Sequence, residues 1–282
     1  MKPVLKYRGG KGKEIPLFEK YIPKEFDTYY EPFIGGGAVF FHLEPKRAVI
    51  NDINAPLMNF YSTLKNQYPL MKKQLLEIQT QYDKNQRQYK ELKQKNPDIR
   101  VPNKNEDLYY SLRGKFNHPD NTYLPAVLYF FINKTAYSGM IRYNSFGEYN
   151  VPFGRYPNFN TEIITEAHSK LLSGATLLNE DYIGSFNRAS ERDFMFLDPP
   201  YDSAFHDYGN AEMGFGEEDQ IRLATDFRNL TCRALMVIGK TPLTEALYSG
   251  LIIGEYGKHY AVNIRNRFNQ NAVHIIVTNY RM

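Results

Sequence analysis

The sequence predicts an α/β protein, and three observations support this class. Before about residue 56 and again after residue 162, short apolar runs without helical periodicity alternate with segments of helical pattern. A glycine-rich turn follows the first of these runs, as in nucleotide-binding folds. One later run, Phe194–Leu197, is stopped abruptly by Pro199 and Pro200. Between these regions, from residue 57 to 162, the composition changes, which indicates a second structural region.

Composition excludes several classes of protein. The 282 residues suit one large or two modest domains. No run approaches the roughly 18 apolar residues of a membrane helix, and the first 13 residues lack the apolar core of a secretory signal. The single cysteine, Cys232, excludes an intrachain disulfide and a cysteine-based zinc site. Together with the missing signal and membrane segment, this single cysteine predicts a cytoplasmic location. The six histidines lack metal-ligand spacing, so we expect no metal.

Charge and aromatic content leave two interpretations open. The net charge of +4 is too small to indicate a nucleic-acid partner by itself. The chain has 23 Tyr and 19 Phe but no Trp. These rings either build the core or, beside Arg and Lys, stack on nucleic-acid bases.

The first strand and its turn predict a nucleotide site. Residues 28–33 have a strand pattern, and Gly35 to Gly37 precede a probable helix, so backbone N–H groups can approach a ligand. The spacing is neither that of the dinucleotide fingerprint nor that of a Walker loop. Asp52 follows the second strand and is placed either to bind ribose hydroxyls or to cap the next helix. The upstream glycines favour the ribose role.

The middle region predicts helices followed by a hairpin. Residues 56–106 read as helices, the last of them solvent-exposed, and residues 124–132 form an apolar segment. Residues 142–153 read as a two-stranded hairpin with Gly147 at its tip. A ribbon that carries Arg and Asn fits the major groove of DNA, where Arg pairs with guanine and Asn with adenine.

The tetrapeptide Asp198–Tyr201 ends the buried run at Phe194–Leu197. It presents a carboxylate, a carbonyl oxygen and an aromatic face close together. These groups suit a planar ligand that bears an amine, with two acceptors for the amine and one ring to stack on the plane. A strand end with an ordinary Pro-Pro turn is the alternative interpretation.

Five motifs in fixed order resemble a known family. They are residues 6–11, residues 31–37, residues 52–54, the recognition block 142–156 and the tetrapeptide 198–201. Together they closely resemble the Dam-type adenine-N6 DNA methyltransferases of the D12 class, whose cofactor motifs come first. The resemblance implies a Rossmann-like fold dependent on S-adenosylmethionine, mostly parallel with an antiparallel end strand. It also implies a catalytic domain of residues 1–56 and 163–282 and an inserted target-recognition domain, 57–162, of helices and a β-hairpin.

The resemblance assigns site residues position by position. The residues matched to S-adenosylmethionine are Tyr7, Lys11, Phe33, Gly35, Asp52, Asp181 and Asp198. Tyr7 departs from Dam itself, which has tryptophan there. For catalysis, Asp198 and the Pro199 carbonyl accept the amine hydrogens of a flipped adenine, and Tyr201 stacks on the base. The residues matched to DNA contacts are Lys6, Tyr137, Met140, Arg142, Asn144, Pro152 and Tyr156.

The expected function is therefore methylation of adenine N6 in a short site of double-stranded DNA, with GATC as the leading sequence. The role is restriction-modification or DNA marking, with a cognate restriction endonuclease as a candidate partner and no membrane. Two alternatives stay open: a cytosine-N4 methyltransferase, and a catalytically silent protein that binds DNA or cofactor. An RNA substrate fits less well, because a groove-reading hairpin suits B-form DNA.

Overall fold

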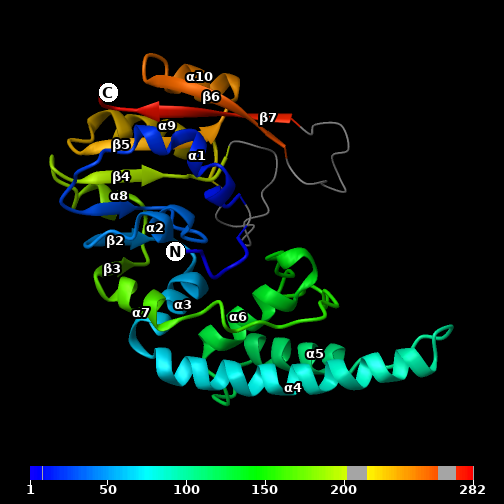
Figure 1. Cartoon of the computed structure of the whole chain (residues 1–282). Helices are drawn as coiled ribbons and strands as arrows, with labels where there is room; N and C mark the ends of the chain where they lie inside the picture. The colour runs from blue at the N-terminus through cyan, green and yellow to red at the C-terminus, as the bar shows by residue number, and fades with distance from the viewer. Residues whose placement is uncertain (8, 202–214, 260–270, 282) are drawn as a thin grey trace. The chain divides into compact units, whose positions relative to one another are not determined.

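A computed structural model describes residues 1–7, 9–201, 215–259 and 271–281 (Figure 1). The described chain forms two compact units. The helical unit comprises Met1–Gly10 and Asn54–Gly174, and the sheet unit comprises Lys11–Ile53 and the described residues from Ala175 onward. The assignment of catalysis and target recognition to residues 1–56 with 163–282 and to 57–162 remains a prediction.

The sheet unit is built on one mixed sheet. Over the described residues the sheet has seven strands in the order β3-β2-β1-β4-β5-β7-β6. All neighbours pair in parallel except β7, which runs antiparallel to both β5 and β6. The predicted α/β class, with a mostly parallel sheet and an antiparallel strand near its end, is confirmed. The strands are β1 (Tyr29–Glu31), β2 (Ala48–Asn51), β3 (Ala175–Leu178), β4 (Phe194–Leu197), β5 (Arg233–Gly239), β6 (Ile252–His259) and β7 (Asn271–Thr278).

The apolar run that ends in two prolines forms the central strand β4. All four of its residues are buried, as a strand covered on both faces requires. It pairs with β1 on one side and β5 on the other. Because β1, β2 and β4 are parallel, the segments that follow them emerge at the same edge of the sheet. This edge carries the glycine turn, Asp52 and the tetrapeptide.

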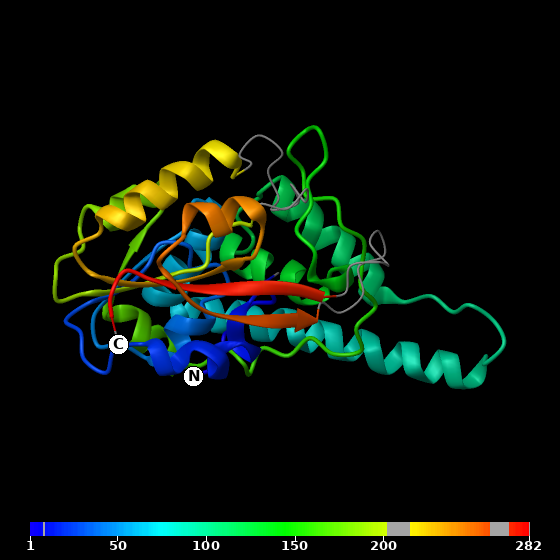
Figure 2. The same ribbon diagram turned by 90° about the horizontal axis from the view of Figure 1, so that it is seen from above.

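Helices cover both faces of this sheet (Figure 2). On one face, α8 (Ile183–Phe186), α9 (Glu217–Asn229) and α10 (Pro242–Leu247) lie over a core that includes Leu223, Phe227, Met195 and Met236. The other face carries two short 3-10 helices, η1 (Lys11–Lys13) and η2 (Glu19–Tyr21), with α1 (Ile15–Phe18) and α2 (Ala38–Leu43). There the ring of Phe18 stacks on Phe196 with centroids 5.3 Å apart.

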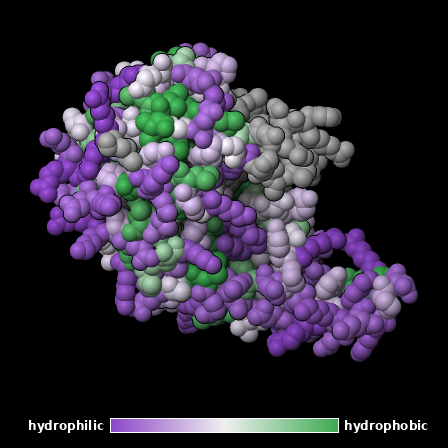
Figure 3. Space-filling model, turned by 45° about the horizontal axis from the view of Figure 1, so that its top comes forward, coloured by the Kyte–Doolittle hydropathy of each residue, from purple (hydrophilic) through white to green (hydrophobic). Residues whose placement is uncertain are grey.

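The helical unit is centred on α6 (Pro125–Thr135), of which nine residues are buried. Helices α3 and α5 pack against α6. The remaining elements are α3 (Ala55–Asn66), α4 (Tyr68–Lys95), α5 (Lys104–Asn117), η3 (Tyr137–Gly139) and α7 (Glu166–Ser173). The far end of α4 and the loop after it, at the lower right of Figure 3, present a mostly hydrophilic surface. None of the helices that the structure describes is long and apolar enough to cross a membrane.

Candidate active site

The tetrapeptide is anchored by a lysine from the start of the chain. The Nζ of Lys11 donates to Oδ1 of Asp198 at 2.6 Å and to the hydroxyl of Tyr201 at 2.6 Å. The Tyr201 hydroxyl is also 3.3 Å from the same Asp198 oxygen. Lys11 is only 2% exposed, so its charge is shielded from water and directed at Asp198. Three residues predicted for the site, Lys11, Asp198 and Tyr201, are thus in direct contact.

A buried glutamine fixes the backbone of the tetrapeptide. The Nε2 of Gln220, on α9, donates to the carbonyl oxygen of Pro200 at 2.8 Å. Gln220 is fully buried, and its Oε1 has no hydrogen-bond partner among the described residues. Neither proline can donate a backbone hydrogen bond, so this side chain supplies the restraint that a ladder bond would otherwise give. Sequence reasoning missed Gln220, because no local pattern links a residue of α9 to residue 200.

The glycine turn and Asp52 form one structure. The backbone N–H of Gly35 donates to Oδ2 of Asp52 at 3.0 Å. Gly35 and Gly37 have φ values of 46° and 70°, which glycine adopts without strain. The helix-cap alternative for Asp52 is wrong, because the side chain of Asn54 caps α3 by accepting from Leu57 N.

Asn51, the last residue of β2, joins two loops at this edge of the sheet. Its Nδ2 donates to the carbonyls of Pro32 and Glu180 at 3.0 and 2.9 Å, and its Oδ1 accepts from the backbone N–H of Glu180. The segment before Asp181 is therefore tied to the glycine turn and to β2. Asn51 is 1% exposed and was not among the predicted site residues. The sequence feature that could have identified Asn51 is an amide residue at the carboxyl end of an apolar strand.

The predicted adenine partner, Asp181, is held in place by two contacts. Its Oδ1 accepts from the backbone N–H of Ile183 at 2.9 Å, and its Oδ2 accepts from Arg222 at 2.6 Å. The Arg222 guanidinium lies 4.6 Å from the ring centroid of Tyr182. Asp181 remains 42% exposed on its side chain, so a ligand can still reach it.

Three aromatic rings pack together here, one of them Tyr182, which follows Asp181 in the chain. The Phe33 ring is 5.6 Å from Tyr182 and 6.0 Å from Phe215, centroid to centroid. Phe33 was predicted to lie beneath the cofactor, whereas Tyr182 and Phe215 were not assigned to the site. Tyr182 is itself buried, whereas Phe33 and Phe215 are partly buried and are suited to contact a planar heterocycle.

Glu31 is a buried carboxyl group that sequence reasoning did not assign to the site. Its Oε2 accepts from the Tyr29 hydroxyl at 2.7 Å and from Phe40 N at 3.0 Å, which ties β1 to α2. Burial raises the pKa of Glu31 to about 8, and the nearby Asp198 charge acts in the same direction. The carboxyl is therefore mostly protonated at neutral pH.

In the helical unit, Lys6 contacts the end of α6 and one other predicted DNA residue, Tyr156. The backbone of Lys6 exchanges two hydrogen bonds with the side chain of Asn133, at 2.9 and 2.7 Å. Its Nζ donates to the carbonyl of Lys134 and lies 3.9 Å from the ring centroid of Tyr156. The pKa of Lys134 is lowered to about 8, mainly by burial and in addition by the nearby charge of Lys6. Arg8, in the same motif, lies outside the described residues.

The predicted hairpin turns at Gly147, whose φ is 77°, but it differs from a two-stranded ribbon. Its arms are joined by an isolated bridge between Tyr143 and Tyr149. Beside this bridge, the N–H of Asn144 donates to the Glu148 carbonyl and the N–H of Asn150 donates to the Arg142 carbonyl. Within the turn, Oδ1 of Asn144 also accepts from the N–H groups of Phe146 and Glu148.

The two predicted base-reading residues behave differently. The Nδ2 of Asn144 donates to Oε2 of Glu148 at 3.1 Å, so its whole amide is used within the turn. Arg142 lies on the exposed side of the hairpin, and its Nε donates to Oδ1 of Asn150 at 2.7 Å. Phe146, at the tip, is 87% exposed and was not predicted as a DNA contact.

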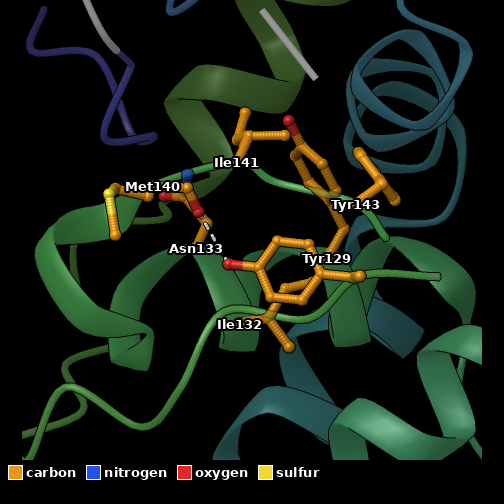
Figure 4. Close-up of a pocket in the computed structure, with 7 residues that line it drawn as sticks. Tyr129, Ile132, Asn133, Met140, Ile141 and Tyr143 are labelled. Atoms are coloured by element: carbon orange, nitrogen blue, oxygen red, sulfur yellow. Dashed lines mark hydrogen bonds between the residues drawn. The ribbon is translucent and has the colours of Figure 1, made fainter. Parts of the chain in front are cut away.

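Met140 borders a small pocket between α6 and the hairpin segment (Figure 4). The hydroxyl of Tyr149 donates to the Met140 carbonyl at 2.7 Å and so ties two parts of the hairpin segment together. Tyr137 is 45% exposed, and its N–H donates to the Pro152 carbonyl at 2.9 Å. Tyr7 falls in the helical unit with these residues, whereas the other predicted cofactor residues fall in the sheet unit.

Comparison with known proteins defines the class to which this site belongs. Residues 7–264 match the family of D12 class N6 adenine-specific DNA methyltransferases. The chain belongs to this family and is an adenine-specific DNA methyltransferase.

Similar proteins cover between 70% and 99% of the chain. The type II methyltransferase M.CviBI of Paramecium bursaria Chlorella virus NC1A is 36% identical over 99% of this chain and all of its own length. The type II methyltransferase M1.LlaDCHI of Lactococcus lactis subsp. cremoris is 31% identical over 99% of this chain and 96% of its own. The DNA adenine methylase of Escherichia coli (strain K12) is 30% identical over 70% of this chain and 64% of its own.

Proposed function

We propose that this enzyme transfers the methyl group of S-adenosylmethionine to N6 of an adenine that has been rotated out of a short duplex DNA site. The observation that carries this proposal is the contact of Lys11, Asp198 and Tyr201 at the carboxyl end of β4. A strand that merely ends at two prolines does not need a buried cation, a carboxylate and a ring in direct contact. They support an active centre for an amine on a planar base.

The residues around the glycine turn fit S-adenosylmethionine chemically. The carboxylate of Asp52 suits ribose hydroxyls, and the rings of Phe33 and Phe215, which pack on the buried Tyr182, suit the adenine. The unpartnered Oε1 of Gln220 is a further buried acceptor beside the tetrapeptide. When bound, the cofactor supplies a methyl group made electrophilic by a positively charged sulfur.

The chain's own residues would orient and polarise the adenine amine. Lys11 and Tyr201 both contact Oδ1 of Asp198, and Oδ2 has no hydrogen bond among the described residues. One carboxylate oxygen is thus anchored and the other can accept from the amine. Because Gln220 binds the Pro200 carbonyl, the second acceptor in this proposal is the carbonyl of Pro199. Such orientation and electrostatic stabilisation need no covalent intermediate on the enzyme.

Target recognition is proposed for the helical unit. Arg142 would pair with a guanine, while Tyr137 and Met140 would contact the duplex near the flipped base. Asn144 would act mainly by shaping the turn, since its amide is engaged within it. Lys6, Pro152 and Tyr156 complete the proposed surface. The proposed site is GATC, with a cognate restriction endonuclease as the partner in the cytoplasm, where the DNA lies.

Two experiments test these proposals. Single-molecule sequencing of DNA from cells that express the gene, in a host without adenine methylation, should show N6-methyladenine in one short motif. A motif other than GATC overturns the proposed sequence and leaves the chemistry in place. A duplex with 2-aminopurine at the target adenine should brighten when the enzyme binds, and an unchanged signal would count against base flipping.

A further inference from the structure

A buried polar cluster lies behind Tyr201 in the sheet unit. Its centre is Glu14, which is 6% exposed and accepts from His274 Nδ1 at 2.8 Å, Tyr256 OH at 2.7 Å and Lys258 Nζ at 2.5 Å. Burial opposes ionisation of Glu14, but the hydrogen bond from His274 and the charge of Lys11 lower its pKa to about 2. Glu14 is therefore a carboxylate at neutral pH, and His274 donates to it from Nδ1.

The register of the sheet places Tyr201 in line with this cluster. Gly239 on β5 pairs with His274 on β7, which pairs with Tyr256 on β6. Residues paired across neighbouring strands point to the same face. Gly239 has no side chain, and a Cβ there would lie 3.5 Å from Cδ2 of Tyr201. The Tyr201 ring thus lies over Gly239, edge-to-face with the His274 ring at a centroid distance of 5.1 Å.

Glu14 is connected to both groups that hold Tyr201. Its side chain accepts from His274, which contacts the ring of Tyr201. Its backbone N–H donates at 2.7 Å to the carbonyl of Lys11, whose ammonium binds the hydroxyl of Tyr201. One residue therefore restrains both ends of the tyrosine side chain.

We propose that Glu14 and His274 are positioning residues that fix the ring of Tyr201 in the plane on which the flipped adenine stacks. The inference rests on the proposed function of Tyr201. Glu14 fixes the orientation of the His274 ring, and that ring, together with Lys11, restrains Tyr201. With Tyr201 fixed before the base arrives, less conformational freedom is lost as the reacting geometry forms.

The test is the variant Glu14→Gln, which keeps the size of the side chain and removes its charge. The matched control is Glu255→Gln on β6, whose carboxylate is exposed and binds Lys240 at 2.6 Å. We expect Glu14→Gln to lower kcat by about tenfold to a hundredfold and to leave the KM for DNA within about twofold. A duplex with 2-aminopurine at the target adenine should be brighter in complex with Glu14→Gln than with the wild type, because stacking on Tyr201 is looser. The protein has no tryptophan to interfere with this signal.

A Glu14→Gln protein that matches Glu255→Gln in both kcat and fluorescence overturns the inference. If Glu14→Gln does not fold, the variant His274→Asn is used to test the inference. Asparagine keeps a hydrogen-bond donor for Glu14 near the position of Nδ1 and removes the ring that contacts Tyr201. Loss of kcat with brighter 2-aminopurine in His274→Asn supports the role, and wild-type values in both readouts refute it. Failure of the wild-type protein to methylate DNA would instead refute the proposed function.

Discussion

Replacing Asp198 by asparagine tests the proposed role of its carboxylate without emptying the site. Lys11 is buried against Oδ1 of Asp198, so alanine would leave a buried ammonium with less compensation and cost stability. The amide oxygen of asparagine can still accept from Lys11 and Tyr201. Its NH₂ group would then face the adenine amine, a donor opposite a donor. We therefore expect a folded, DNA-binding protein that has lost the acceptor needed for transfer.

The expected loss follows from the number of contacts removed. Deleting one oriented polar contact at a reacting centre typically lowers kcat by about 10²- to 10³-fold, or about 2.7–4 kcal/mol. The assay is single-turnover transfer of a labelled methyl group to duplex DNA, with DNA affinity measured by fluorescence anisotropy. The control is Asp27→Asn, at the opposite end of β1, where Asp27 pairs with Arg192 at 3.1 Å. A rate for Asp198→Asn within about threefold of the control would refute the reasoning.

Two further predictions concern specificity and pH. Arg142→Ala should cost about 1–3 kcal/mol in binding the cognate site and relax selectivity at one base pair; equal weakening on all sequences, in competition assays, would make Arg142 a phosphate contact. Glu31→Gln should flatten the pH dependence of stability. Because the pKa of Glu31 is raised from 4.5 to about 8 in the folded state, the wild-type free energy of unfolding should fall relative to the variant between those pH values. The expected slope is about 1.4 kcal/mol per pH unit, measured by urea unfolding, and parallel curves would contradict it.

Local pattern was sufficient for the α/β class and for several elements, whereas the sheet with its antiparallel strand came from the family resemblance. The run Phe194–Leu197 is β4 with the predicted bounds, because four apolar residues before two prolines have few alternatives to a buried strand. The glycine turn and Asp52 were placed correctly at one edge, since parallel strands bring their carboxyl ends together. The hairpin was predicted with its turn at Gly147, but the sequence pattern does not show how short the pairing of its arms is, nor that the Asn144 side chain binds N–H groups of the turn.

The contacts between side chains within the site could not be predicted from the sequence alone. Lys11 and Asp198 are far apart in the chain, and their contact depends on where η1 packs relative to the end of β4. The buried groups Gln220, Glu14 and His274 are further examples, because each acts through a partner on another element. Asn51 is the exception. A polar residue that ends an apolar strand could have been singled out from the sequence.

The most direct test of the account is to identify the methylated base. The purified enzyme should be incubated with labelled S-adenosylmethionine and unmethylated duplex DNA, and the product digested to nucleosides. The account predicts that the label is found in N6-methyladenine and that Asp198→Asn abolishes most of it. Label in N4-methylcytosine, or no transfer to DNA containing all short sites, would contradict it.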